Sequence, residues 1–302
     1  MARWRSRSRD GLRPSIVALA IGVASAGVVG AESSGSAELR FSRHGETVAT
    51  RSVEALTRLV PPQRVRVFEP YENREIPFVA LSLDAVLDAI YTDAWRSEEE
   101  ILFTCLDGYQ PTLPVQRALD HRGWLAVARI DQADFSIQKV ESGSRQRIRL
   151  APVYLVWENL DDDALRREGD YGWPYQLVGI DLIRARERFP KMVPPEGAPA
   201  DAVAGFTAFR VHCSRCHAIN GEGGTIGPDL NVPANPVETR NVAWIRRWID
   251  DPSQILPTAR MPRLNPALPA RDRVIEQLIR YLQAMAADPK PGASDEATPN
   301  GS

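Results

Sequence analysis

The sequence predicts a multidomain chain in which an N-terminal α+β domain is followed by an all-α domain. Three observations support this fold class. Strand-like runs recur between residues 32 and 189, four prolines lie within residues 190–200, and residues 201–287 end in a long amphipathic helix. The chain has 302 residues, of which 43% are hydrophobic and 25% charged, so it has enough apolar side chains for more than one globular core.

The first 31 residues have the order of a secretory signal sequence. Five arginines and one aspartate lie within residues 1–14, and the uncharged stretch from Ile16 to Ala31 ends in small residues suited to cleavage. This stretch is shorter than the ~20 apolar residues that span a bilayer. We therefore expect a cleaved Sec-type signal at residues 1–31, a periplasmic protein and no stable membrane span; an uncleaved anchor is the alternative.

The rest of the chain is mildly acidic. Lysine and arginine number 37 against 39 aspartate and glutamate, and the formal charge of −2 becomes −6 without residues 1–31, which carry five basic groups and one acidic group. Proteins that bind nucleic acid through its phosphates carry a basic surplus. The charge balance therefore predicts that nucleic acid is not a partner.

The domain expected at residues 32–189 contains both helix-like and strand-like patterns of apolar residues. One helix is predicted after a capping Ser82, because Leu83, Val86, Leu87 and Ile90 fall on one face. The strand-like runs are rich in β-branched and aromatic residues, and we expect them to pair mostly antiparallel. They are Arg64–Phe68, Glu100–Leu106, Trp124–Ile130, Arg147–Trp157 and Tyr175–Ile183.

Two segments outside the domains are rich in proline. Residues 190–200 favour extended, polyproline-like backbone over helix or sheet and are expected to form a linker. Residues 288–302 are polar, contain three prolines and are expected to be a disordered tail. The last helix of the second domain is predicted just before this tail, with one apolar stripe made of Val274, Leu278, Tyr281, Leu282 and Met285.

Three cysteines are too few, and odd in number, for a disulfide framework. Two of them belong to the segment CSRCH, in which Cys213 and Cys216 are followed directly by His217. Cysteines at i and i+3 near a helix end project from the same side, so both sulfurs can reach the two vinyl groups of one haem while the histidine ligates its iron. The alternatives are a disulfide, a zinc half-site that lacks a second Cys-x-x-Cys, or a thioredoxin-like pair that lacks a βαβ setting.

The second domain, residues 201–287, resembles a class I mono-haem cytochrome c. Gly205, Phe209 and Cys213 reproduce the Gly-x-x-x-aromatic-x-x-x-Cys pattern of the family's first helix, and Tyr281 stands where an aromatic residue packs against that glycine. The resemblance implies one covalent haem c, with thioethers from Cys213 and Cys216 and with His217 as an axial ligand of the iron. By the same analogy, the segment GPDL places the carbonyl of Pro228 on the His217 imidazole.

Met261 is the candidate for the second axial ligand. Met1 falls in the signal, Met192 in the linker and Met285 on the stripe of the last helix, which leaves Met261 in a proline-rich loop. That loop resembles the distal-ligand loop of the cytochrome family. The alternative is a surface or gap-filling methionine.

The first domain resembles the molybdopterin-binding domain of the sulfite-oxidase type over about residues 50–188, with Asp107-Gly108-Tyr109 as the shared segment. Active members of that family carry a molybdenum-ligating cysteine well upstream, and this chain has none from residue 32 to residue 104. Cys105 lies in an apolar strand and is expected to be a buried core thiol. Molybdopterin is therefore not an expected cofactor.

These observations favour an electron-transfer protein over an enzyme, with the first domain docking redox partner proteins. The alternative is a haem-containing, molybdopterin-dependent oxidoreductase that passes electrons from the first domain to the haem. A haem-based sensor would need an open iron position, which His/Met ligation does not leave.

Overall fold

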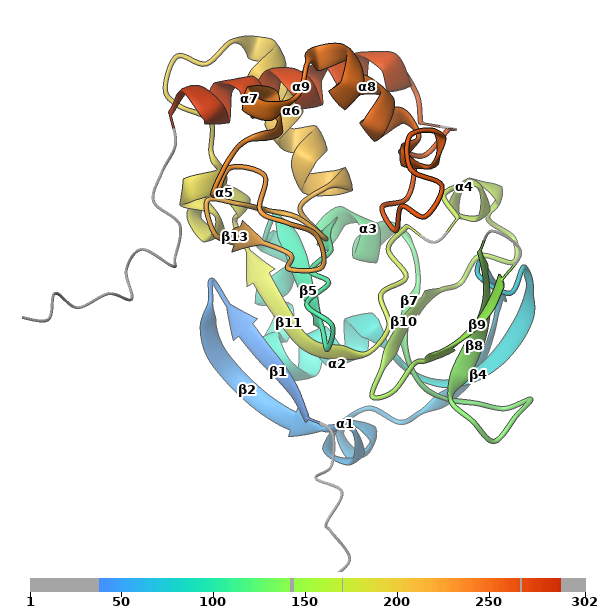
Figure 1. Ribbon diagram of the computed structural model, residues 1–302. Helices are drawn as coiled ribbons and strands as arrows, with labels where there is room; N and C mark the ends of the chain where they lie inside the picture. The colour runs from blue at the N-terminus through green and yellow to red at the C-terminus, as the bar shows by residue number, and fades with distance from the viewer. Residues whose placement is uncertain (1–37, 142–143, 170, 267, 289–302) are drawn as a thin grey trace, which may run out of the picture. The chain divides into compact units, whose positions relative to one another are not determined.

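The computed structural model describes residues 38–141, 144–169, 171–266 and 268–288 (Figure 1). The expected signal sequence at residues 1–31 and the expected tail from residue 289 onward lie outside the described residues. Within the described part of the chain, no helix is long and apolar enough to cross a membrane. The described residues comprise a β-rich α+β region followed by a helical region.

The first sheet of the N-terminal region has five strands in the order β2-β1-β11-β5-β6. Strands β1 and β11 pair in parallel, and the other neighbours in this sheet pair antiparallel. The expectation of mostly antiparallel strands is therefore confirmed. The bounds are β1 Glu38–Arg43, β2 Glu46–Ser52, β5 Glu100–Cys105, β6 Thr112–Pro114 and β11 Leu177–Ile183.

The second sheet of this region has four antiparallel strands in the order β10-β7-β4-β3. Its strands are β3 Gln63–Glu69, β4 Arg74–Ser82, β7 Gly123–Arg129 and β10 Tyr154–Trp157. A separate hairpin joins β8 Ser136–Glu141 to β9 Ser144–Arg149. A large hydrophobic core, which includes Phe41, Phe78, Trp95, Phe103 and Tyr154, draws on both sheets.

Short helices connect the strands of the N-terminal region. The predicted helix α2 is confirmed at Leu83–Tyr91, with the Ser82 hydroxyl accepting the N–H of Ala85 and with Leu83, Val86 and Leu87 buried. The remaining helices are α1 Val53–Leu59, α3 Val115–Asp120, α4 Asp163–Arg167, α5 Ala185–Arg188 and the 3-10 helix η1 Thr92–Ser97.

The C-terminal region contains helices and a short hairpin of two strands with two residues each. Its predicted last helix is confirmed as α9, whose stripe residues Leu278, Tyr281, Leu282 and Met285 are buried. Helix α6 crosses α9 and packs against it (Figure 1). The bounds are α6 Ala200–His212, α7 Pro236–Thr239, α8 Val242–Asp250, α9 Arg271–Ala287, β12 Ala218–Ile219, β13 Glu222–Gly223 and the 3-10 helix η3 Pro252–Gln254.

Two local expectations need correction. The run 147–157 is not one strand: β9 ends at Arg149 and β10 begins at Tyr154 in a different sheet. Pro152 lies between them, and proline has no N–H to donate to a β-ladder. Extended backbone throughout residues 190–200 is also wrong, because residues 190–192 form a 3-10 turn, η2. The carboxylate of Glu222 accepts the N–H groups of Lys191 and Met192 in this turn.

Candidate functional site

The segment Cys213–His217 follows directly from helix α6. The N–H groups of Cys213 and Ser214 both donate to the Phe209 carbonyl at 2.8 Å. Those of Cys216 and His217 donate to the Cys213 carbonyl at 3.0 and 2.9 Å. The chain thus turns tightly once more beyond the helix. Both cysteines are half-buried free thiols, so neither is used in a disulfide.

The imidazole of His217 is anchored on one of its two nitrogens. Its Nδ1 lies 2.8 Å from the carbonyl oxygen of Pro228. A carbonyl oxygen only accepts hydrogen bonds, so Nδ1 carries the proton in this pair and Nε2 keeps its lone pair. Burial lowers the pKa of His217, and the hydrogen bond to Pro228 opposes this shift. The neutral imidazole is the form that ligates a metal.

Gly227 makes room for this imidazole. A Cβ atom at position 227 would lie 2.4 Å from Cε1 and 2.6 Å from Nδ1 of His217, closer than real Cβ contacts allow. The glycine-rich loop after the Cys-x-x-Cys-His segment therefore passes directly against the ring that the sequence predicts as a ligand. The structure brings together four of the predicted site residues, namely Cys213, Cys216, His217 and Pro228.

Helix α6 is held in place by a close crossing with α9. A Cβ atom at Gly205 would lie 1.9 Å from the backbone oxygen of Gln277 and 2.8 Å from the Cβ of Tyr281. The ring of Tyr281 contacts Phe209 with a centroid distance of 5.1 Å. The predicted packing of Tyr281 against Gly205 is confirmed. This crossing fixes the helix end from which the cysteines follow.

Three asparagines that the sequence analysis did not single out fix the loop after His217. The Asn231 amide donates to Asn220 at 2.8 Å and to the Met285 carbonyl at 3.2 Å. The Asn235 amide donates to Asn231 at 2.7 Å and to the Leu282 carbonyl at 3.0 Å. This buried amide chain ties the loop to α9. Asparagines in a loop follow no helix or strand period, so the sequence pattern gave no signal for them.

Met261 lies on a separate loop, between η3 and α9. Its side chain is half-buried and belongs to none of the three hydrophobic clusters of the described residues. Met192 and Met285 are fully buried in the second cluster. Among the methionines that the structure describes, Met261 is thus the one that is not packed into a core.

The other histidines have different surroundings. His44 lies 2.8 Å from Glu98, and His121 lies 3.2 Å from Asp162, both in the N-terminal region. His212 is the last residue of α6, where burial lowers its pKa to about 4. His212 directly precedes Cys213, so it is tethered on the same side as the attachment segment.

The N-terminal region meets the cysteine segment through a turn that begins at Asp107. The backbone N–H of Gln110 donates to the Arg215 carbonyl at 2.9 Å, and the N–H of Thr225 donates to the Gly108 carbonyl at 3.3 Å. Gly108 has φ +86°, and a Cβ there would lie 2.2 Å from Oγ1 of Thr225. A larger residue at position 108 would be strained by the positive φ and would force the Thr225 side chain to move.

Cys105 lies at the end of β5 and is only 4% exposed. It is part of the large hydrophobic core, as expected. Burial raises the pKa of its thiol well above the ordinary value, which disfavours the thiolate that a metal needs. Among the described residues, no group of three or more His, Cys, Asp or Glu side chains is arranged to hold a metal ion.

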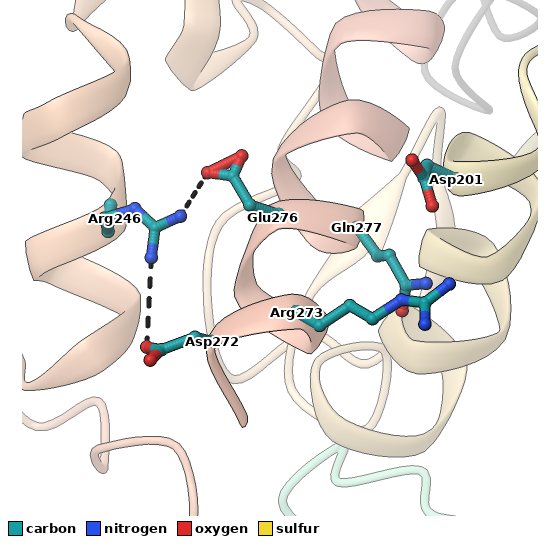
Figure 2. A pocket seen from close by; sticks show the side chains of 6 residues that line it. All are labelled: Asp201, Arg246, Asp272, Arg273, Glu276 and Gln277. Carbon is teal, nitrogen blue, oxygen red and sulfur yellow. Dashed lines mark hydrogen bonds and ion pairs between the residues drawn. The ribbon is translucent and has the colours of Figure 1, made fainter. Parts of the chain in front are cut away.

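A surface depression lies between three helices of the C-terminal region. It has a volume of about 410 Å³ and is lined by charged and amide side chains of α6, α8 and α9. Figure 2 shows Arg246 of α8 reaching Glu276 and Asp272 of α9, so this cation is neutralised within the wall. None of the residues predicted for the site lines it. This depression is a polar groove between helices rather than the site.

A helical region with Cys-x-x-Cys-His after its first helix, and with the histidine anchored on a proline carbonyl, defines the class of c-type cytochrome domains. Residues 202–286 match the cytochrome c family. This part of the chain is a cytochrome c domain, which implies covalently bound haem c, haem-based electron transfer and redox partners. The match leaves the N-terminal region without an assigned family. No curated protein was found to match the chain.

Proposed function

We propose that the protein is an exported, periplasmic carrier of single electrons. Cys213 and Cys216 hold haem c by thioethers, and His217 and Met261 are the axial ligands of its iron. The observation that carries the proposal is the pair of free thiols one turn apart beside an imidazole that Pro228 and Gly227 fix in place. The c-type cytochromes are typically extracytoplasmic, in keeping with the signal expected at residues 1–31.

The residues around His217 fit the haem c that they would hold. The glycine at 227 leaves a cradle for the His217 ring that any Cβ would fill, and the Pro228 carbonyl keeps Nε2 available as the ligating atom. When bound, haem c with a histidine and a methionine ligand supplies one-electron redox chemistry without an open iron position. The role of this chain is therefore to attach, orient and shield the group.

Met261 is the proposed second axial ligand. Met192 and Met285 are committed to a core, whereas Met261 sits half-buried on a loop. We expect Met261→Ala to abolish the weak sulfur-to-iron band near the red end of the ferric absorption spectrum. Met285→Leu is the matched control and should keep that band, because Met285 is buried in the second cluster together with Tyr281 and residues of α6. A Met261→Ala spectrum identical to that of the wild type would remove Met261 as a ligand.

The N-terminal region is proposed to dock redox partners and to carry no molybdenum. Its Gly108–Gln110 turn lies against the cysteine segment, so a partner bound to this region is brought near the site of electron exchange. Elemental analysis of the purified full chain tests the assignment. We expect one iron per chain, from the single Cys-x-x-Cys-His segment, without stoichiometric molybdenum. Molybdenum near one per chain would instead establish the molybdopterin-dependent oxidoreductase.

A further inference from the structure

Arg215, one of the two residues between Cys213 and Cys216, reaches into the N-terminal region. Nη1 of Arg215 donates to the hydroxyl of Tyr109 at 3.3 Å, and its guanidinium carbon lies 5.4 Å from the ring centroid of Tyr171. The backbone oxygen of the same residue accepts the N–H of Gln110. Arg215 is thus held at both its main chain and its side chain by residues far away in the sequence.

Tyr171 also contacts a second guanidinium. The carbon of the Arg117 guanidinium lies 5.3 Å from the Tyr171 ring centroid and 4.8 Å from that of Trp157, which is fully buried. Arg117 is paired with Glu168 at 2.6 Å. The contacts therefore run from the buried Trp157 through Arg117 and Tyr171 to Arg215. Contacts of this kind between a cation and an aromatic face are attractive because the face of the ring is electron-rich.

The two arginines differ in their charge balance. Glu168 neutralises Arg117, whereas Arg215 has no carboxylate oxygen within 4.0 Å in the part of the chain that the structure describes. Its partners there are a phenol, an aromatic ring and the carbonyl of His212. A positive charge is thus held in place on Arg215, directly before Cys216, with no ion-pair partner among the described residues.

We propose that Tyr171 is a positioning residue for the haem site: it holds the Arg215 guanidinium beside the attachment cysteines and thereby raises the reduction potential of the protein. This inference rests on the proposed function. A fixed cation near the iron favours the reduced state, which carries one positive charge less, and a partly buried charge is screened less than a mobile one in solvent. Tyr171 acts only through Arg215.

The experiment is a double-mutant cycle read out as midpoint reduction potential. We expect Arg215→Gln to lower the potential and Tyr171→Leu to lower it by a smaller amount, because the freed guanidinium moves into solvent. Tyr171→Phe keeps the ring and should match the wild type. The double variant Tyr171→Leu/Arg215→Gln should have the potential of Arg215→Gln alone. A purely structural role for Tyr171 would lower thermal stability and leave the potential unchanged.

Either of two results would overturn the proposal: a wild-type potential for Tyr171→Leu, or shifts that add in the double variant. If Tyr171→Leu does not fold, the Arg215→Lys variant is measured in its place. Lysine keeps the positive charge but lacks the planar guanidinium that contacts the Tyr171 ring. Its potential is expected between those of the wild type and Arg215→Gln, and a wild-type value contradicts the proposal. Covalent haem is measured in every sample by staining after denaturation. A wild-type chain without it refutes the proposed function itself, whereas loaded variants with unchanged potentials refute only this inference.

Discussion

At the scale of single residues, the proposed site depends on its glycines as much as on the side chains that would hold the haem. Gly227 lies against His217, and Gly108 lies against Thr225. Glycine has no Cβ, so the backbone at each of these two positions can pass close to another group. The structure identifies the two groups as an imidazole and a threonine hydroxyl.

Gly227→Ala tests the contact with His217. The added Cβ would lie 2.4 Å from the ring and push the imidazole off the Pro228 carbonyl, so we expect a loss of the low-spin haem spectrum. Overpacking of this kind costs about 1–3 kcal/mol of unfolding free energy. Absorption spectroscopy and thermal unfolding measure the two effects. An unchanged spectrum together with wild-type stability would show that the ring does not depend on position 227.

At the scale of elements, the crossing of α6 and α9 decides where the cysteine segment begins. Sequence periodicity predicted α9, and the glycine–aromatic pair predicted the crossing. The break between β9 and β10 was not predicted, because the apolar run at residues 147–157 reads as continuous although Pro152 interrupts its hydrogen bonding. The period of apolar residues along the chain predicts well whether a segment is a helix or a strand. It predicts poorly which sheet a strand joins.

Gly205→Ala tests the helix crossing. The new Cβ would meet the backbone oxygen of Gln277, which cannot rotate away, so the two helices must separate. We expect the unfolding free energy, measured by denaturant titration, to fall by about 1–3 kcal/mol. The low-spin haem absorption spectrum that His217 ligation gives should be retained. Val203→Ala, on an exposed position of the same helix, is the control and should change stability by less than about 0.5 kcal/mol. Equal stability of the Gly205→Ala variant and the wild type would argue against the crossing.

At the scale of the whole molecule, the second hydrophobic cluster draws on both regions. Leu102 and Ile183 of the first sheet belong to it together with Phe206 and Tyr281 of the helical region. Met192 lies in the same cluster, and its carbonyl accepts the hydroxyl of Tyr281 at 2.6 Å. The segment expected to be a linker therefore contributes a buried residue to this core.

Met192→Ala tests whether this segment is packed or free. Removal of a fully buried methionine side chain is expected to lower the unfolding free energy by about 2–5 kcal/mol, measured by chemical denaturation of the full chain. Glu196→Ala, at an exposed position of the same segment, serves as the control with little expected change. A loss below about 0.5 kcal/mol for Met192→Ala would favour a free linker.

The sequence by itself determined the Cys-x-x-Cys-His segment, the candidate ligands, the glycine-marked helix crossing and the types of most elements. These features are encoded locally, in side-chain chemistry and in the period of apolar residues along one segment. Only the tertiary structure decided that Tyr109 and Tyr171 hold Arg215, that Asn220, Asn231 and Asn235 tie the loop to α9, and that Met192 is buried. Such contacts join residues far apart in the chain, and they depend on how the elements pack rather than on any pattern within one of them.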